Sequence, residues 1–236
     1  MKPYEITYRI LSSDTDRYRR LRISRMFSFL QEAAIAHTEQ LGAGREKTLD
    51  RGYLWVITLQ QAAIERMPEY DEAITIQSLP GERMHMFFPR YYRVLDENGE
   101  TIIRASALWL LMDANERKMV QPQDIGITLP GQKPDWETFL PALPPLPKNA
   151  QKQDFTAPYS SIDLNGHMNH TRYFDLAEDL MPADLRDKNI KEIRSEFKGE
   201  VRQDEPIGLE YTTDGNKFLL SGTGERRLFR ISMEYK

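Results

Sequence analysis

The sequence predicts an α+β protein made of two similar halves, each with one helix followed by antiparallel strands. Two observations support this. One helical pattern followed by several strand-like runs occurs twice along the 236 residues. A proline-rich segment separates the two occurrences, and six of the fourteen prolines lie between Pro130 and Pro147. One long helix followed by several antiparallel strands, twice over, favours a sheet wrapped around a helix in each half.

The first half, residues 1–130, begins with a helical pattern that we expect to run from Ser24 to Gly42. Ser24 is a typical N-cap residue, and Gly42 is a typical C-terminal stop. One face of this helix would carry Met26, Leu30, Ala33, His37 and Leu41. Strand-like runs follow at residues 53–59, 73–79, 84–95 and 101–112, and Asn98-Gly99 marks a hairpin between the last two.

Residues 131–150 form the predicted linker, because proline at this density continues neither a helix nor a strand. The second half, residues 151–236, has an extended lead and a helix that ends at Pro182. Its strand-like runs lie at residues 193–201, 207–213, 217–222 and 227–235. Two such units side by side could form one continuous sheet.

The two halves can be superposed in sequence, which indicates an internal duplication. One overlay places Asp16 on Asp163, and a second places Asp71-Glu72 on Asp204-Glu205. The second overlay also sets Met67 opposite Glu200. Polar and ionisable side chains therefore gather in the second half, and their counterparts in the first half differ.

The composition excludes several classes of protein. With 40% apolar residues the chain can bury a core, and its net charge of −4 argues against a general nucleic-acid binder. There is no cysteine, which excludes disulfides, thiolate metal sites and a cysteine nucleophile. The N-terminus does not resemble a signal peptide, and no segment has the roughly 20 apolar residues of a membrane helix. We expect a cytoplasmic protein without membrane insertion.

Arginines are concentrated ahead of the first helix, within nine residues: Arg17, Arg19, Arg20, Arg22 and Arg25. Such a cluster could dock an acidic partner through its positive charge. It could equally be an ordinary solvated surface.

The candidate site lies ahead of the second helix, where Asp163, Asn165, His167 and Asn169 recur at every second position. If the segment is extended, these side chains point to one side. A helix N-terminus adds unpaired amides and partial positive charge. Together these groups could polarise a carbonyl and position a water molecule.

Each of these residues also has a plain structural interpretation. Asp163 and Asn169 could cap a turn or the helix, and His167 could be a hydrogen-bonded core residue. Glu200 could be a surface strand residue between charged neighbours. A metal site that adds His170 is not expected, because His170 would face away from His167 on an extended segment.

Three motifs in register resemble the acyl carrier protein (ACP) thioesterases of plants and bacteria. The first is the run Asp163-x-Asn165-x-His167-x-Asn169-x-x-Tyr173. The second is Ile64-Glu65-Arg66-Met67-Pro68, with its flanking runs Trp55-Val56-Ile57 and Ile74-Thr75-Ile76. The third is the segment from Arg104 to Met112. Together the motifs span most of the chain.

The resemblance implies a double hotdog fold, in which each half wraps a sheet around a long helix. It implies hydrolysis of fatty acyl-ACP thioesters without a cofactor or metal. The catalytic residues carried over are Asp163, Asn165, His167 and Glu200, in the second half. Plant relatives have a cysteine after this glutamate, whereas this chain has Val201, so water must attack the thioester.

Within this scheme Glu200 is the candidate general base and His167 is the alternative. Asn165 and backbone amides near Asn169 and His170 would stabilise the oxyanion. The acyl pocket would lie in the first half. The proposed substrate-binding residues are Asn169, Tyr173, Met84, Met86 and Phe88.

Several alternatives remain at the level of sequence. Met84-His85-Met86-Phe87-Phe88 could line an acyl tunnel, because Met and Phe suit a flexible chain, or it could be core packing. The protein could act on acyl-coenzyme A, bind acyl groups without catalysis, or act as a dehydratase or hydratase. A homodimer is possible.

Overall fold

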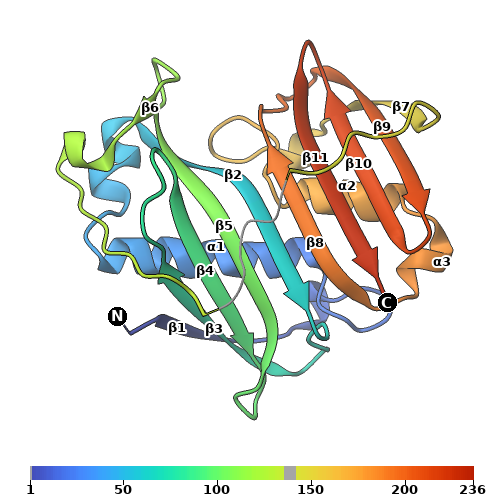
Figure 1. Ribbon diagram of the computed structural model, residues 1–236, viewed down its shortest axis with the longest axis horizontal. Coiled ribbons are helices and arrows are strands. Elements are labelled where there is room, and N and C mark those ends of the chain that lie inside the picture. Colours follow the sequence, from blue (N-terminus) through green and yellow to red (C-terminus); the bar gives the residue numbers. More distant parts are fainter. Residues whose placement is uncertain (1, 136–141) are drawn as a thin grey trace.

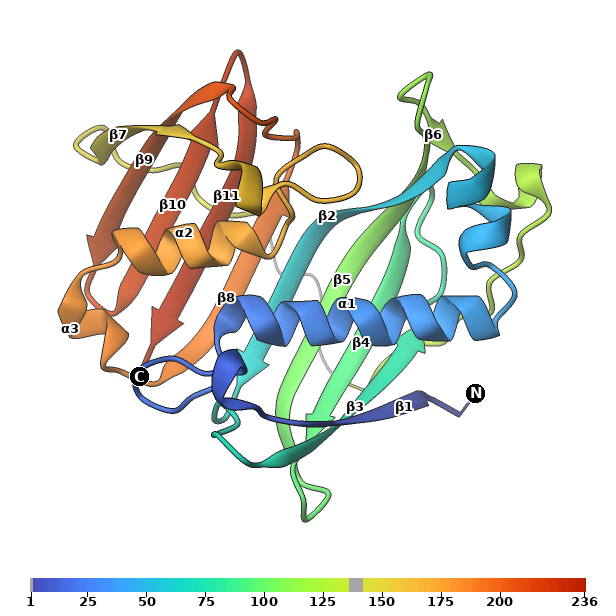
Figure 2. The same cartoon turned by 180° about the vertical axis from the view of Figure 1, so that it is seen from behind.

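The computed structural model describes residues 2–135 and 142–236. Its strands form one antiparallel sheet of eleven strands, and the two main helices lie on one face of it (Figures 1 and 2). This is the double arrangement of helix and wrapping sheet that the sequence predicts. Among the described residues, no helix is long and apolar enough to cross a membrane.

The first half contains one long helix, α1, and six strands. α1 begins at Ile23 with Arg22 as its N-cap, so the expected cap at Ser24 is wrong, and Ser24 is buried inside the first turn. Gly42 follows the helix with φ 71°, a conformation in which glycine avoids the strain of a side chain. The elements are β1 (Tyr4–Arg9), α1 (Ile23–Gln40), β2 (Tyr53–Ile64), β3 (Ala73–Pro80), β4 (Phe88–Leu95), β5 (Thr101–Asp113) and β6 (Met119–Val120).

The second half repeats this order with a helix of half the length. α2 has 9 residues and α1 has 18. The strand expected at residues 193–201 runs instead from Ile190 to Phe197, and the chain then turns away from the sheet. The elements are β7 (Gln151–Thr156), α2 (Arg172–Leu180), α3 (Ala183–Arg186), β8 (Ile190–Phe197), β9 (Pro206–Asp214), β10 (Lys217–Thr223) and β11 (Arg227–Tyr235).

The two halves join through their sheets and through their helices. The strand order is β1-β3-β4-β5-β2-β8-β11-β10-β9-β7, with β6 beside β5. β2 of the first half pairs with β8 of the second, from Leu59 opposite Glu196 to Ala63 opposite Glu192. Under the sheet, Phe27 of α1 stacks on Phe174 of α2 with ring centroids 4.3 Å apart. Both rings are fully buried, so one core continues across the seam.

The segment after the first half crosses the other face of the sheet. Residues 142–150 contain neither helix nor strand, and residues 136–141 of the predicted linker lie outside the described residues. The Leu143 amide donates to Glu196 Oε1 at 2.6 Å, and Arg230 donates to the Pro144 carbonyl oxygen at 2.9 Å. Arg230 also pairs with Glu196 Oε2 at 2.7 Å. The linker therefore covers a buried ion pair.

Candidate active site

The segment that carries the polar motif is a tight turn, so the expectation of an extended strand with all four side chains on one side is wrong. The Asp163 amide donates to the His167 carbonyl oxygen at 2.9 Å, and the Gly166 amide donates to the Asp163 carbonyl oxygen at 3.0 Å. Asp163 Oδ1 accepts the Asn165 amide at 2.8 Å. Gly166 has φ 78°, which suits glycine. The pair Asn165-Gly166 is a turn signal that could have revealed this.

The first half contains the same turn, which gives the internal duplication a structural basis. Asp16 receives the Tyr18 amide at 2.8 Å through Oδ1, and its own amide donates to the Arg20 carbonyl oxygen at 2.8 Å. Arg19 takes the place of Gly166, with φ 67°. Arg20 then occupies the position of His167. The repeat has kept the backbone geometry and changed the side chains.

His167 and Glu200 come together because two segments pair behind this turn. The Met168 amide donates to the Val201 carbonyl oxygen at 2.8 Å, and His167 forms an antiparallel bridge with Arg202. His167 Nε2 lies 2.9 Å from Glu200 Oε2. The two side chains are 17% and 27% exposed, so the pair is partly shielded and still open to water.

Arg117 is a third member of this cluster, and the sequence analysis missed it. Its Nη2 forms an ion pair with Glu200 Oε2, the same oxygen that His167 contacts. Arg117 belongs to the turn between β5 and β6 of the first half. Nothing in the charged run Asn115-Glu116-Arg117-Lys118 distinguishes it from an ordinary surface turn, and only the fold brings it to Glu200.

The remaining residues of the motif have local structural contacts. Asp163 holds its own turn, as described above. Asn169 Oδ1 accepts the Thr171 amide at 3.0 Å and the Thr171 hydroxyl at 2.8 Å, just ahead of α2. Tyr173 is buried against Phe197 and Phe229 and hydrogen-bonds to the backbone of Val201. Burial raises the pKa of Tyr173 well above its usual range.

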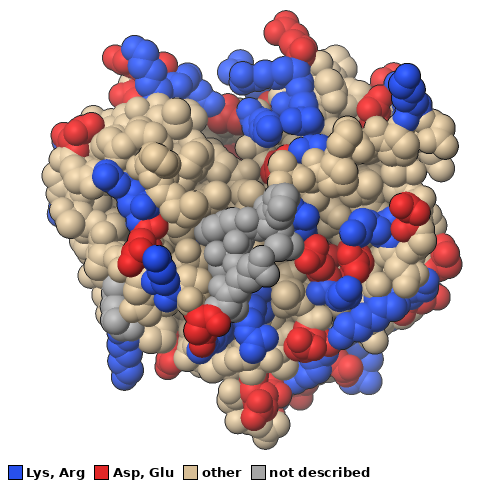
Figure 3. All heavy atoms as spheres, viewed as in Figure 1, with Lys and Arg blue, Asp and Glu red and all other residues tan. Residues whose placement is uncertain are grey.

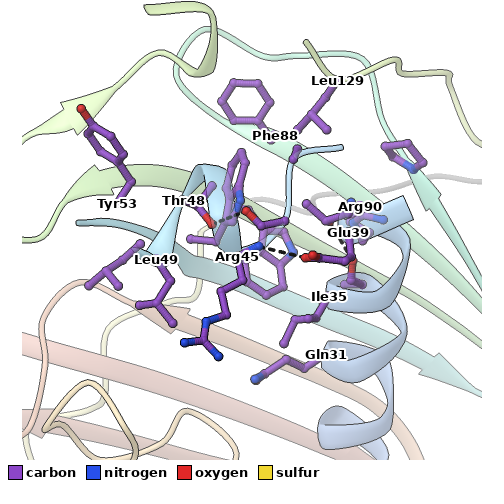
Figure 4. A pocket seen from close by; sticks show the side chains of 18 of the residues that line it. Gln31, Ile35, Glu39, Arg45, Thr48, Leu49, Tyr53, Phe88, Arg90 and Leu129 are labelled. Atoms are coloured by element: carbon purple, nitrogen blue, oxygen red, sulfur yellow. Dashed lines mark hydrogen bonds between the residues drawn. The ribbon is translucent and has the colours of Figure 1, made fainter. Parts of the chain in front are cut away.

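A cavity of about 220 Å³ opens in the first half beside α1 (Figure 4). Its walls are largely apolar and include Leu54, Trp55, Phe88, Trp109 and Leu129. Leu164 and Asn165, from the turn of the second half, also line it. The cavity therefore extends from the first half to the turn that carries the polar motif.

Of the three residues expected in an acyl tunnel, Phe88 lines this cavity and the two methionines do not. Residues 84–87 form a turn, in which His85 has φ 56°. Met84 is 47% exposed, and Met86 contacts Gln121. Of this run, Phe88 contributes to the cavity wall, where β4 begins, and a role of the two methionines in substrate binding stays a prediction.

The wall of the cavity also contains a buried guanidinium, that of Arg90. It donates to His37 Nδ1 at 3.1 Å, to the Ser78 hydroxyl at 3.1 Å and to the Thr38 hydroxyl at 2.8 Å. Burial and the charge of Arg90 lower the pKa of His37 to about 4. His37 is therefore a neutral acceptor at neutral pH.

A second cavity, polar and of about 300 Å³, lies between α1 and the loop ahead of α2. Asp163 and Asn169 line it together with the side chains Ser24, Arg25, Ser28, Gln31, Glu32, Ser160, Ser161, Ile162, Thr171 and Arg172. The turn of residues 163–166 thus has an apolar cavity on one side and a polar cavity on another. Across the described ranges, no group of three His, Cys, Asp or Glu side chains is placed to hold a metal ion.

Comparison with known proteins agrees with this architecture. Residues 1–125 match the model of the acyl-ACP thioesterase N-terminal domain, and residues 146–227 match that of the C-terminal domain. A chloroplastic palmitoyl-ACP thioesterase of Arabidopsis thaliana is 24% identical over 204 residues, 77% of this chain and 48% of its own length. A chloroplastic dodecanoyl-ACP hydrolase of Cinnamomum camphora is 24% identical over 98% of this chain and 66% of its own. The chain spans about half the length of the first of these relatives.

Solved structures show the same fold over nearly the whole chain. An acyl-ACP thioesterase from Bacteroides thetaiotaomicron has a TM-score of 0.84 at 22% identity, covering 98% of this chain and 97% of that one. The 12:0-ACP thioesterase of Umbellularia californica has a TM-score of 0.81 at 20% identity, covering 99% and 96%. Both halves match, in order, the two domains of one family. The chain therefore belongs to the acyl-ACP thioesterase family.

Proposed function

We propose that this protein hydrolyses fatty acyl-ACP thioesters to a free fatty acid and the carrier thiol. The observation that carries the proposal is the contact of His167 with Glu200 behind a turn whose Asn165 lines the apolar cavity. A fatty acyl chain fits the apolar walls, and its thioester would then lie at the turn. The names of the relatives support the same substrate class.

The proposed reaction uses a water molecule as the nucleophile. His167 and Arg117 both contact Glu200 Oε2, which leaves Oε1 to accept a proton from water. The water oxygen attacks the carbonyl carbon, and the side-chain amide of Asn165 stabilises the oxyanion. The Asn169 amide, expected from the sequence as a further donor, already donates to the Ser161 carbonyl oxygen at 2.9 Å. The C–S bond of the tetrahedral intermediate then breaks. The leaving thiolate takes the proton that Glu200 Oε1 had accepted from water.

A covalent acyl-enzyme on sulfur is excluded by the sequence. The chain has no cysteine, and the residue after Glu200 is Val201, which is fully buried. Its side chain packs into the core next to the catalytic pair. The Glu200 carboxylate can therefore act either as a base that activates water or as a nucleophile through its own oxygen. Its contact with His167 favours the activation of water.

We place carrier docking on basic surfaces, in keeping with an acidic partner. Arg17, Arg19 and Arg22 are exposed, whereas Arg20 is engaged by Asp16 and by carbonyl oxygens near α3. The loop that carries these arginines contacts the backbone just before β8, whereas Glu200 follows the opposite end of that strand. Lys and Arg side chains also gather along the upper edge in Figure 3, the edge where β8 ends in Figure 1.

The test is thiol release from purified protein with ACP and coenzyme A thioesters of graded acyl length. Because the protein has no cysteine, a thiol reagent reports only the product. We expect faster release from ACP thioesters, with about 10²- to 10⁴-fold lower kcat in Glu200→Gln. His167→Ala should also lower kcat.

Other outcomes would separate the alternatives. Preference for coenzyme A substrates would reassign the carrier. Binding of acyl groups without thiol release would indicate a noncatalytic acyl-binding protein, and hydration of an unsaturated thioester with the thioester intact would indicate a hydratase. Wild-type turnover in folded Glu200→Gln would remove the proposed base.

A further inference from the structure

The carboxylate of Glu200 is held from both halves of the molecule. His167 approaches Oε2 from the turn ahead of α2, and Arg117 approaches the same oxygen from the turn between β5 and β6. The side chain of Arg117 is 40% exposed and that of Glu200 is 27% exposed. The ion pair is therefore partly solvated, and its energy in a surface setting is small. The ion pair therefore contributes mainly to the position of the Glu200 carboxylate, and little to the stability of the fold.

The turn that carries Arg117 is organised to present this side chain. Asp113 Oδ1 accepts the amides of Asn115 and Glu116 at 2.9 and 2.8 Å, and the Arg117 amide donates to the Asp113 carbonyl oxygen at 3.0 Å. Arg117 itself has φ 56°, in the left-handed region. A residue with a side chain costs roughly 1 kcal/mol there, which glycine would avoid. Arg19 and His85 adopt the same conformation, so what distinguishes Arg117 is the contact of its guanidinium with Glu200.

The chemistry of the three groups defines the role of this contact. The Arg117 guanidinium donates hydrogen bonds and accepts none, so Glu200 Oε2 is the acceptor in this contact. His167 Nε2 must then be the donor to Glu200. Glu200 is near enough to Tyr173 to help raise the pKa of the tyrosine, after the larger effect of burial. Lys198 and Arg202 lie two residues to either side of Glu200 in the sequence, in exposed positions.

We infer that Arg117 is a positioning residue for the reaction, contributed by the half that lacks the catalytic pair. This inference rests on the proposed function. Arg117 fixes Glu200 Oε2, aims Oε1 at the attacking water, and keeps the Nε2-protonated tautomer of His167. The first half therefore supplies both the acyl cavity and one support of the catalytic carboxylate.

The test compares Arg117→Met, Arg117→Lys and the matched control Lys118→Met. Lys118 is on the same turn and, among the described residues, forms its ion pair with Glu116. In Arg117→Met we expect kcat to fall about 10- to 100-fold because the base is misplaced, with KM little changed. Arg117→Lys should recover part of this loss, since it restores the charge but not the planar fork. Lys118→Met should match the wild type.

A second readout does not depend on activity. In protein labelled with ¹⁵N at histidine, the His167 ring should show the Nε2–H tautomer at neutral pH, and Arg117→Met should mix the two tautomers. His167→Ala assigns the signal among the four histidines. If the wild type releases no thiol but Arg117→Met changes this signal, the proposed function fails and the positioning contact stands.

Two results would overturn the inference. One is an unchanged kcat and an unchanged His167 signal in Arg117→Met. The other is an equal loss of kcat in Arg117→Met and Lys118→Met, which would show that the turn matters and the guanidinium does not. Thermal melting of each variant confirms that the comparison is between folded proteins.

Discussion

Asp163 acts, in the described contacts, on its own turn rather than on the Glu200–His167 pair. Its Oδ1 accepts the Asn165 amide, and its backbone closes the turn at both ends. Asp16 does the same in the first half, where Arg20 stands in the position of His167. The shared geometry indicates that this aspartate came with the duplicated turn. Under the proposed function, Asp163 would act through the placement of Asn165.

The charge of Asp163 should therefore matter less than its side-chain acceptor. Asp163→Asn keeps an oxygen for the Asn165 amide, so we expect kcat/KM and the melting temperature close to those of the wild type. Asp163→Ala loses the acceptor and should cost about 1 kcal/mol in stability, with lower kcat. Thiol-release kinetics and thermal melting measure both effects. A loss in Asp163→Asn as large as in Glu200→Gln would show that the carboxylate itself is catalytic.

His170 makes the stability of the protein depend on pH. Burial lowers its pKa to about 3, its Nε2 has no hydrogen-bond partner among the described residues, and its ring lies edge-on to Phe197. The unfolded chain takes up this proton near pH 6.5 and the folded protein does not. The contribution of neutral His170 to the free energy of unfolding is therefore fully present above pH 6.5. It is lost as the pH falls toward the pKa of His170 in the folded protein.

Replacing His170 with Phe should remove this part of the acid sensitivity. We expect the free energy of unfolding, measured in urea from pH 7 to pH 4.5, to fall less steeply in His170→Phe, by up to about 1.4 kcal/mol per pH unit. His37, with its lowered pKa, accounts for part of the slope that remains. The exposed His85 provides the control variant His85→Phe. An identical slope in His170→Phe and the wild type would contradict the assignment.

At this scale the sequence identified residues but not their geometry. The contact of His167 with Glu200 could be predicted because a motif and a family resemblance named both. The turn at Asp163 could have been read from Asn165-Gly166. Arg117 could not, because its position depends on how the β5–β6 turn folds across the seam between the halves.

Among the elements, the linker and the outer face of the sheet form a unit with a buried ion pair. Glu196 and Arg230 are 8% and 5% exposed, and the linker backbone at Leu143 and Pro144 contacts both. Burial would raise the pKa of Glu196, but the Leu143 amide and Arg230 outweigh it and lower the pKa. The carboxylate therefore stays ionised while it anchors the linker.

Breaking this pair on one side should be costly. Arg230→Met leaves an uncompensated buried carboxylate, and we expect a loss of about 3–5 kcal/mol in the free energy of unfolding. The double variant Glu196→Met/Arg230→Met should lose much less than the sum of the single variants. The surface pair of Lys191 and Glu234 is the control, and Lys191→Met should leave the free energy of unfolding close to that of the wild type. Additive losses in urea unfolding would mean that the pair is not coupled.

Most elements could be predicted because their patterns are local. The hairpin at Asn98-Gly99 forms as expected, with Gly99 at φ 81°. The errors fall where tertiary contacts decide. β1 was not expected from the sequence. Its side chains alternate between half-buried and exposed because the strand pairs with β3. The strand expected to reach residue 201 ends at Phe197, where the Lys198 and Gly199 amides both donate to the Leu228 carbonyl oxygen. An added Cβ at Gly199 would lie 2.7 Å from the Leu228 side chain, so this close contact requires glycine.

In the whole molecule, the two halves of the duplicated chain contribute different parts of the site. The first half has the apolar cavity and the second has the pair His167–Glu200 that we propose as catalytic, and each half contributes one residue to the other's site. Asn165 lines the cavity, and Arg117 contacts Glu200. This exchange requires the two halves to keep a fixed relation, which the β2–β8 pairing and the Phe27–Phe174 stack provide. The sequence could suggest a continuous sheet, but not which strands meet.

If the halves share one core, they should unfold together. The three tryptophans are Trp55, Trp109 and Trp136, so none lies in residues 151–236 and tryptophan fluorescence reports on the rest of the chain. Phe218 is fully buried in the second half. Phe218→Ala should cost about 3–5 kcal/mol and should lower the urea midpoint equally by fluorescence and by far-ultraviolet circular dichroism. This coincidence is expected because the β2–β8 seam and the stacked helices leave no half with a complete core of its own. A fluorescence transition that stays at the wild-type midpoint, with a separate earlier step by circular dichroism, would show that the halves unfold independently and that the seam is weaker than its buried contacts suggest.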